Sequence, residues 1–300
     1  MATIKVSGIS KSFGNTKAVQ EVSFEVEKGE VVGFVGPNGA GKTTTISMVM
    51  GFIRSDQGSV NVFDQLVQPY SAHRTHARIG FASGDMALFN NLTGKQYLNF
   101  MAHTVEAKPV ARETLIAAFK PVLHKPLKQL SRGNKQKIAL IGAMQHEPEL
   151  IILDEPTSGL DPLMQDVFLD AITKAKHRGA TVFMSSHILS EVASSCDRVL
   201  FMKHGQIIMN RDVNELEKQQ GKIIVITAPT ETLELVAKEL PKDAVEMQKA
   251  EHTVRFRYTG EVKPLLAWLS KLTNLEDATI TRQDLDDIFH NLYQDEEPKV

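Results

Sequence analysis

A glycine-rich stretch near the start of the chain combines residue types that together can hold a nucleotide phosphate. Residues 36–43 read GPNGAGKT, which fits the pattern G-x-x-x-x-G-K-[ST]. Glycines let backbone N–H groups turn toward a phosphate, and the helix that follows adds the partial positive charge of its N-terminus. We expect Lys42 to reach the β- and γ-phosphates and Thr43 to coordinate Mg²⁺. The predicted nucleotide-binding residues of this loop are Gly36, Asn38, Gly39, Ala40, Gly41, Lys42, Thr43 and Thr44.

Polar side chains that could act on a phosphate follow two later apolar runs. Asp154 and Glu155 come directly after LIIL, and His187 follows TVFMSS. We predict that Asp154 is a second Mg²⁺ ligand and that Glu155 orients and deprotonates a water. His187 could hydrogen-bond the γ-phosphate or that water, so Glu155 and His187 are the candidate catalytic residues. The structural alternatives are a solvated acidic pair and a histidine satisfied by nearby backbone.

A second loop also has chemistry suited to a phosphate. Residues 129–141 read QLSRGNKQKIALI, which places Ser131 and Gly133 at the start of a predicted amphipathic helix. The serine hydroxyl and the glycine N–H can both donate to an anion, and the helix dipole points the same way. A plain helix N-cap at Ser131 is the alternative. Since the loop at 36–43 is already complete, the second loop needs a separate explanation.

The hydrophobic pattern predicts an α/β fold that brings these residues to one sheet edge. The first thirty residues alternate apolar and polar positions, as in a half-exposed antiparallel sheet. Short apolar runs at 31–35, 150–153 and 181–184 then alternate with helical stretches, which indicates a parallel sheet with ligands at the carboxyl ends of its strands. Residues 92–148 look mainly helical and interrupt this series.

The chain from residue 222 onward has a different predicted order of strands and helices. Its predicted order is strand, helix, strand, strand, helix and strand, which is typical of a small ferredoxin-like α+β domain, with a closing helix in LDDIFHNLYQ. We therefore expect a nucleotide-binding domain at 1–215, with an inserted helical subdomain at about 85–148, and an accessory domain at 216–300.

Composition places limits on partners and compartment. The 300 residues are 42% hydrophobic, and 34 Lys and Arg against 36 Asp and Glu give a net charge of −2, so no bulk charge favours nucleic acid or anionic lipid. The lone cysteine, Cys196, excludes an internal disulfide and is expected to be buried. Apolar runs fall short of the roughly 18–20 residues of a membrane span, so we expect a cytosolic chain that does not cross a membrane alone.

Residues 36–44, 130–136, 153–161 and 187 together resemble the ATP-binding cassette family of transporter ATPases, over roughly residues 1–215. LSRGNKQ stands at the signature motif of that family, ILDEP at its second nucleotide motif, SGLD at its dimer-contact loop and SSH at its switch histidine. The resemblance implies ATP and Mg²⁺ as cofactors and two copies packed head to tail. It further implies that Ser131, Gly133 and Asn134 of one chain close over the γ-phosphate held by the other, and that Asp161 reaches across the dimer.

The chain departs from the family pattern at three places. Phe13 stands where the family more often has a tyrosine that stacks on adenine, and stacking does not require the hydroxyl. Arg132-Gly133-Asn134 replaces Gly-Gly-Gln, and the arginine could strengthen anion binding or point to solvent. Gly84-Asp85 replaces the glutamine that senses the metal, and Asp85 could hold Mg²⁺ through a water.

By resemblance, the chain is the ATPase subunit of a bacterial-type exporter, peripheral on the inner face of the cell membrane and bound to a separate permease. Met86, Leu88, Phe89 and Leu92 would contact the permease, or else pack internally. Residues 222–300 would support dimerisation or regulation, and no nucleic acid partner is expected. A DNA-associated ATPase of this family would need a long coiled coil, and no sustained heptads are visible; a ribosome-associated one usually carries two ATPase heads, and the sequence has one glycine-rich loop and one signature motif. The altered loop at 84 leaves a weakly hydrolysing regulator open.

Overall fold

The computed structural model describes residues 1–84, 89, 91–188, 194–219 and 221–283. The chain forms two compact units, Met1–Val213 and Asn214–Val300. The boundary that we expect from the sequence, between residues 215 and 216, falls close to this division. Each unit is described by itself below.

The first unit opens with an antiparallel sheet in the order β2-β1-β4-β5. Its strands are β1 (Ala2–Phe13), β2 (Thr16–Glu27), β4 (Gln57–Val62) and β5 (Gln65–Leu66). Ile4, Val6 and Phe24 of β1 and β2 are buried, whereas Lys5, Ser7 and Glu25 between or beside them are exposed. The half-exposed antiparallel sheet predicted from the alternating pattern is confirmed.

A mainly parallel sheet forms the centre of this unit, in the order β10-β9-β3-β8-β7-β6. Its strands are β3 (Val31–Val35), β6 (Ile79–Ser83), β7 (Leu150–Asp154), β8 (Thr181–Ser186), β9 (Arg198–Lys203) and β10 (Gln206–Asp212), of which β10 pairs antiparallel with β9. Every residue of β3, β7 and β8 is buried, which explains why these strands read as continuous apolar runs.

The register of the parallel strands brings their carboxyl ends to one edge. Val35 of β3 lies beside Ser186 of β8, and Ser83 of β6 lies beside Asp154 of β7. The glycine-rich loop, the acidic pair and His187 directly follow these strands. The expectation that the chemistry-bearing residues share one sheet edge is therefore confirmed.

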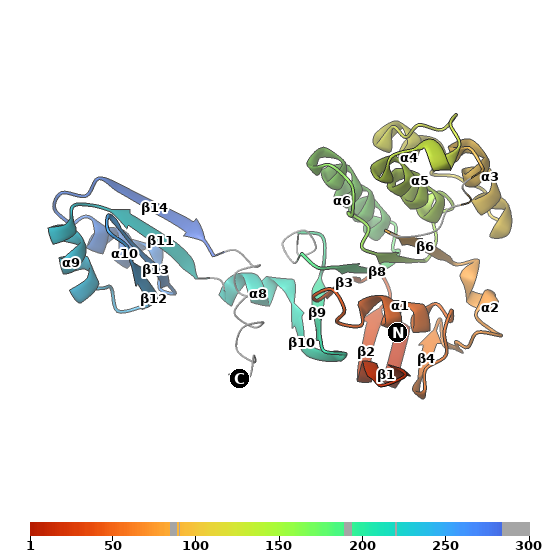
Figure 1. The fold of residues 1–300 in the computed structure, drawn as a ribbon, viewed down its shortest axis with the longest axis horizontal. Helices are drawn as coiled ribbons and strands as arrows, with labels where there is room; N and C mark the ends of the chain where they lie inside the picture. The colour runs from red at the N-terminus through yellow and green to blue at the C-terminus, as the bar shows by residue number, and fades with distance from the viewer. Residues whose placement is uncertain (85–88, 90, 189–193, 220, 284–300) are drawn as a thin grey trace. The chain divides into compact units, whose positions relative to one another are not determined.

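Helices cover both faces of the parallel sheet. Figure 1 shows α1 between the two sheets, and α5 and α6 on the opposite face of the parallel sheet. The helices of this unit are α1 (Lys42–Val49), α2 (His73–His76), α3 (Gly94–Thr104), α4 (Arg112–Phe119), α5 (Arg132–Met144) and α6 (Pro162–His177), with a 3₁₀ turn at Leu127–Gln129. The stretch from α3 to α5 is the inserted helical region expected from the sequence.

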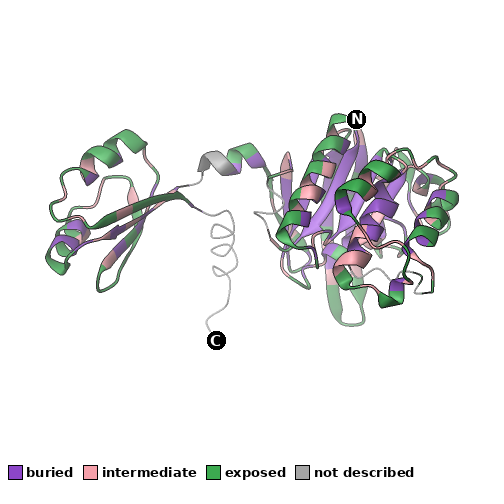
Figure 2. Ribbon diagram, turned by 90° about the horizontal axis from the view of Figure 1, so that it is seen from above, coloured by how far each residue is buried: buried purple, intermediate pink, exposed green. Residues whose placement is uncertain are grey.

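The core of the first unit joins the two sheets through aromatic rings. The Phe183 ring of β8 lies 5.3 Å, centroid to centroid, from both Phe24 of β2 and Phe34 of β3. Ile46, Met48 and Val49 of α1 belong to the same apolar cluster, and Figure 2 shows the buried strands as the interior of this unit. Burial of this cluster fixes α1, and with it the preceding glycine-rich loop, against the sheet edge.

The second unit has the strand and helix order expected of a ferredoxin-like domain. Its elements are α8 (Val213–Gln219), β11 (Lys222–Thr227), α9 (Thr230–Lys238), β12 (Ala244–Lys249), β13 (Thr253–Tyr258), α10 (Val262–Leu269) and β14 (Asp277–Arg282). The strands form an antiparallel sheet in the order β12-β13-β11-β14, and its core includes Ile224, Leu233, Phe256 and Leu265. The predicted closing helix in LDDIFHNLYQ lies outside the described residues.

Two expectations about single features can be compared directly with the structure. Cys196 is buried, and this burial raises the pKa of its thiol, as expected for a structural cysteine. Within the described ranges, no helix combines the length and the hydropathy that a bilayer span requires.

Candidate functional site

The glycine-rich loop between β3 and α1 is a tight backbone cradle. A Cβ atom on Gly36 would overlap the carbonyl oxygen of Met202, and one on Gly41 would overlap that of Ala18. Gly39 and Gly41 also have positive φ angles of 82° and 108°, which favour glycine. Packing therefore requires glycine at Gly36 and Gly41, whereas Gly39 is favoured by its backbone conformation.

The helix that follows this loop begins at an uncapped N-terminus. Gly41 is the N-cap of α1, and no side chain of the described residues caps its first turn. The free N–H groups and the helix dipole therefore favour an anion at this end. Lys42 is only 5% exposed, and its Nζ donates to the carbonyl oxygens of Gly36 at 2.6 Å and Pro37 at 3.2 Å.

A pocket of about 530 Å³ opens above this loop. Its lining includes Asn38, Gly39, Gly41, Lys42, Thr43, Thr44 and Glu155, together with Thr16, Lys17, Ala18, Gln20, His204 and Gly205. Gly36 and Ala40 are not among the described lining residues, and the Ala40 carbonyl accepts a hydrogen bond from Gly205 N–H at 2.9 Å. Phe13 does not line the described pocket, but it is 53% exposed and pairs in the β1–β2 register with Thr16, which does.

Asp154 lies at the end of β7 and faces Thr43. Its Oδ2 accepts a hydrogen bond from Thr43 Oγ1 at 2.8 Å, and its Oδ1 accepts one from Ser185 Oγ at 2.6 Å. Oxygen donors of these two kinds, a carboxylate and a hydroxyl, are the ligands that Mg²⁺ prefers. Thr43 and Asp154, predicted as metal ligands, are therefore adjacent in the fold, although they lie far apart in the sequence.

Glu155 lies between Lys42 and His187. Its Oε2 is hydrogen-bonded to His187 Nδ1 at 2.7 Å, and its Oε1 is 3.3 Å from Lys42 Nζ. Glu155 Oε1 is buried and accepts no hydrogen bond with good geometry from the described residues, so its contact with Lys42 is an ion pair. The fold thus brings Lys42, Glu155 and His187 into one cluster beside the phosphate cradle.

The second loop has a different environment. Ser131 is the N-cap of α5, and its Oγ accepts hydrogen bonds from Asn134 N at 3.4 Å and from Asn134 Nδ2 at 3.3 Å. A Cβ atom on Gly133 would lie 2.6 Å from the Gly159 carbonyl oxygen, so this position also favours glycine. In the part of the chain that the structure describes, Ser131, Gly133 and Asn134 do not line the pocket above the first loop.

Asp161 and Asp85 are two further residues that the sequence predicts for the site. Asp161 is the N-cap of α6, and its Oδ1 accepts a hydrogen bond from Met164 N at 3.0 Å. Asp85 lies outside the described residues, as do Met86 and Leu88. Its neighbour Gly84 donates its N–H to the Asp154 carbonyl at 2.8 Å, so the strand end before Asp85 is tied to the acidic pair.

Several residues of this site were not predicted from the sequence. Ser185 is fully buried, and its Oγ both donates to Asp154 and accepts from Glu155 N at 3.0 Å, so it orients both acidic residues. Its position two residues before His187, on an apolar strand, is the signal that could have indicated it. Lys17 and His204 come from two hairpins whose approach to the phosphate loop depends on sheet pairing and is not visible in a local pattern.

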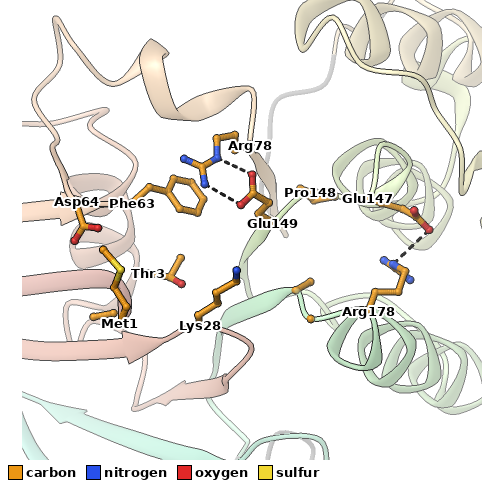
Figure 3. A pocket seen from close by; sticks show the side chains of 13 residues that line it. Met1, Thr3, Lys28, Phe63, Asp64, Arg78, Glu147, Pro148, Glu149 and Arg178 are labelled. Atoms are coloured by element: carbon orange, nitrogen blue, oxygen red, sulfur yellow. Dashed lines mark hydrogen bonds and ion pairs between the residues drawn. The ribbon is translucent and has the colours of Figure 1, made fainter.

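A second pocket, of about 600 Å³, lies at the amino ends of β6, β7 and β8 (Figure 3). Arg78 there forms two hydrogen bonds with Glu149, at 2.7 and 2.8 Å, and its guanidinium stacks 3.7 Å from the centre of the Phe63 ring. Arg178 pairs with Glu147 at 3.3 Å. These charges neutralise one another, so we assign the chemistry to the smaller pocket at the carboxyl ends.

The chain is similar to families and proteins that are already known. A family model described as ABC transporter matches residues 19–158, and a model described as AAA domain, putative AbiEii toxin, Type IV TA system matches residues 125–193. An uncharacterized ABC transporter ATP-binding protein of Methanocaldococcus jannaschii is 31% identical over 262 residues, which cover 82% of this chain and 94% of that protein. The linearmycin resistance ATP-binding protein LnrL of Bacillus subtilis is 34% identical over 68% of each chain.

A solved structure supports the fold. A dimeric ATP-binding cassette in a post-hydrolysis state, bound to ADP and Pi, matches with a TM-score of 0.62 and 19% identity, over 70% of this chain and 98% of that one. The solved structure agrees with the α/β sheet topology described above. This chain is an ATPase and belongs to the ABC transporter family, as an ATP-binding subunit.

Proposed function

We propose that this ATPase is the subunit of an exporter in which two copies close head to tail around ATP and drive a separate membrane permease. The observation that carries the proposal is the cluster of Lys42, Glu155 and His187 beside an uncapped helix N-terminus. A second loop suited to a phosphate lies at the N-terminus of a different helix, at Ser131. We propose that this loop binds the nucleotide of the other chain.

Glu155 is the general base in this proposal. In the free chain its carboxylate is shared between Lys42 and His187. A γ-phosphate would attract Lys42 Nζ, because an anionic acceptor is stronger than the backbone carbonyls that it now contacts. Glu155 Oε1 would then be available to accept a proton from water, while His187 donates a hydrogen bond to the γ-phosphate. Phe13 would stack on the adenine at the open side of the pocket.

Mg²⁺ fits the residues present, because Thr43 Oγ1 and Asp154 Oδ2 are 2.8 Å apart and both are oxygen donors. We propose that these two residues hold the ion together with ATP. When bound, it would supply positive charge that neutralises the phosphate oxygens. Ser185 keeps the Asp154 carboxylate in the orientation that this role requires.

The second loop supplies groups for the nucleotide of a partner chain. The Ser131 oxygen accepts from Asn134, so its own O–H remains suited to donate to a phosphate oxygen. Gly133 would present its backbone N–H at the same helix end. Asp161 uses Oδ1 to cap α6, so we propose Oδ2 for its contact across the dimer.

Sedimentation of the Glu155→Gln chain tests the dimer. With ATP and Mg²⁺ we expect a dimer, and with ADP a monomer, because only ATP has the γ-phosphate that both loops contact. As a control, the same chain with an added Ser131→Arg should bind ATP and remain monomeric, since the large side chain blocks the second loop only. A dimer that forms equally well with Ser131→Arg would contradict the trans role of this loop.

Export through a membrane permease is supported by the name of the linearmycin resistance relative and by one exposed aromatic pair. Phe89 and Phe100 are 55% and 41% exposed, and their ring centroids are 5.0 Å apart. Leu92 is half-buried beside them, and its N–H donates to the Phe89 carbonyl. We propose that the Phe89–Phe100 pair contacts the permease and holds the subunit on the cytoplasmic face of the cell membrane.

Recovery of the chain with detergent-solubilised membranes tests this contact. Phe89→Asp should abolish co-purification with an integral membrane protein, because it places a charge in an apolar contact. Tyr70→Asp, at a side chain that is 75% exposed elsewhere, is the matched control and should have no effect. Co-purification of the unaltered chain with ribosomes or nucleic acid, and not with membranes, would contradict the transport role.

For residues 216–300 we propose support or regulation of the dimer. This unit has its own apolar core and sheet, whereas the residues that line the described nucleotide pocket come from the first unit. Removing residues 216–300 should change the protein concentration at which ATP induces dimerisation. An unchanged concentration dependence would overturn this proposal.

A further inference from the structure

The start of α5 contacts the segment that directly follows Glu155. Arg132 Nη2 donates to Ser158 Oγ at 2.9 Å, and Gln136 Nε2 donates to the Pro156 carbonyl at 2.8 Å. Gly159, with φ of 81°, leaves space for the Arg132 stem, because a Cβ atom there would lie 3.1 Å from Arg132 Cγ. The second phosphate loop is thus joined to the segment 156–161 within one chain.

We propose that Arg132 couples the two nucleotide sites of the dimer. In the free chain its guanidinium donates to Ser158, and in the closed dimer it donates to a phosphate oxygen of the partner's ATP and releases Ser158. The proposal rests on the head-to-tail dimer proposed above. Arg132 is the position at which this chain departs from the small residue of the family pattern.

The exchange is favoured by charge. Ser158 Oγ is a neutral acceptor, whereas a phosphate oxygen is anionic, and hydrogen bonds between ionised partners are about twice as strong as neutral ones. The planar guanidinium also matches two phosphate oxygens at once. In addition, Arg132 is the first residue of α5, where a positive side chain opposes the helix dipole, and an incoming anion removes that penalty.

The two hydrogen bonds between α5 and the segment 156–161 differ in their exposure. The Arg132–Ser158 bond is exposed to solvent and to an approaching partner chain, whereas the Gln136–Pro156 bond is buried. The first bond can therefore exchange while the second keeps α5 attached to the segment. Only the part of the segment near Ser158 is released.

Ser158, which Arg132 would release, is close to the catalytic residue Glu155. Ser158 N–H donates to the Glu155 carbonyl at 3.2 Å, and the segment ends at Asp161, which caps α6. Ser158 therefore belongs to the turn that follows Glu155 in the same chain. ATP held by the partner would act on this turn through Arg132, and because the dimer is symmetric, each site would respond to the nucleotide in the other.

The test separates the phosphate contact of Arg132 from its contact with Ser158. In the Glu155→Gln chain, Arg132→Gln should raise the ATP-dependent dimer dissociation constant about tenfold for each of the two sites, or about 100-fold in all, from loss of a charge-assisted hydrogen bond. Arg132→Lys keeps the positive charge but lacks the planar guanidinium, so it should raise the dimer dissociation constant less than Arg132→Gln does. Ser158→Ala should not weaken the dimer, because it removes an acceptor that Arg132 uses in the free chain.

Coupling is read from the dependence of the ATPase rate on ATP concentration. With Glu155 intact, we expect a Hill coefficient between 1 and about 2, and Ser158→Ala should lower it toward about 1. ADP affinity of the monomer should be the same in all variants, since Arg132 and Ser158 do not line the described nucleotide pocket. An unchanged ADP affinity shows that a variant is folded. If Arg132→Gln binds ADP more weakly than the unaltered chain, Arg132→Lys is used in its place.

Three results would overturn the proposal. The first is an Arg132→Gln dimer as stable as its parent, and the second is a Hill coefficient that Ser158→Ala leaves unchanged or that is about 1 in the unaltered chain. The third is a Glu155→Gln parent that binds ATP and does not dimerise, which contradicts the head-to-tail dimer itself. The first two results, obtained with a parent that does dimerise, contradict the role of Arg132 alone.

Discussion

Both ends of the parallel sheet carry charged residues, but the two ends use them differently. At the amino ends, Arg78 pairs with Glu149 through two short hydrogen bonds, and Arg178 pairs with Glu147. At the carboxyl ends, Lys42 donates mainly to backbone carbonyls, and Glu155 Oε1 is buried beside it without a hydrogen bond from the described residues.

This difference indicates which end can bind a charged substrate. Charges that already form short pairs lose those contacts when a ligand binds, so little free energy is gained. Lys42 and Glu155, in contrast, have contacts that a phosphate and a water can improve, and an uncapped helix end lies next to them. Pocket size is therefore a poor guide here, because the wider pocket is the one with neutralised charges.

The largest effect should come from removing a carboxylate at the carboxyl end. We expect Glu155→Gln to lower the ATPase rate about 10²- to 10⁴-fold, the range for loss of a general base, while ATP binding is kept. Glu149→Gln, at the amino end, is the matched control and should leave the rate unchanged. Phosphate release assays on both variants check this, and equal rates would remove the distinction between the two ends.

Lysines at the two ends should differ in nucleotide affinity. Lys42→Ala should weaken ATP binding about 10- to 100-fold, because a charge-assisted contact with the phosphates is lost. Lys28→Ala, in the pocket at the amino ends, should bind ATP as the unaltered chain does. Titration calorimetry with each variant measures the two dissociation constants, and a similar loss in both would contradict the assignment of the site.

Ser185→Ala should affect both stability and activity, because the Ser185 hydroxyl forms hydrogen bonds with both residues of the acidic pair. Its loss leaves the buried Asp154 Oδ1 without that donor, which should cost about 1–3 kcal/mol. For a unit of this size that corresponds to a fall in Tm of about 2–4 °C per kcal/mol. Calorimetry should show this fall, together with an increased Mg²⁺ requirement of the ATPase. An unchanged Mg²⁺ requirement would limit Ser185 to a structural role.

The smallest expected effect is the pH dependence of stability that comes from Glu149, at the amino ends of the parallel strands. The hydrogen bonds from Arg78 hold the pKa of Glu149 below its ordinary value of about 4.3. A lowered carboxylate pKa contributes stability above that value, and the contribution is lost as pH falls through the folded-state pKa. The pair is largely exposed, so it should contribute less than about 1 kcal/mol.

Comparison of Tm between the unaltered chain and Glu149→Gln should therefore show a small difference at neutral pH, which is lost as the pH falls through the lowered pKa of Glu149. A difference that grows on acidification would mean that Glu149 is not stabilised by Arg78.

Much of the fold follows from local patterns in the sequence. The alternating first thirty residues, the short apolar runs before Asp154 and His187, and the strand and helix order after residue 222 all correspond to elements of the structure. These predictions succeed because side-chain periodicity reports directly which face of a strand or helix is buried. The glycine pattern at 36–41 similarly indicates positions at which a side chain does not fit, as at Gly36 and Gly41, or at which φ is positive, as at Gly39.

Local motifs in the chain predict a phosphate-binding loop at 36–43 and two carboxylates directly after a buried strand, since each motif has its own chemistry. The folded structure was needed to find that Glu155 is shared between Lys42 and His187, that Ser185 orients the acidic pair, and that Arg132 contacts Ser158. The physical reason is that these contacts join segments far apart in the chain. They depend on the register of neighbouring parallel strands and on how helices pack on the sheet, which no local pattern specifies.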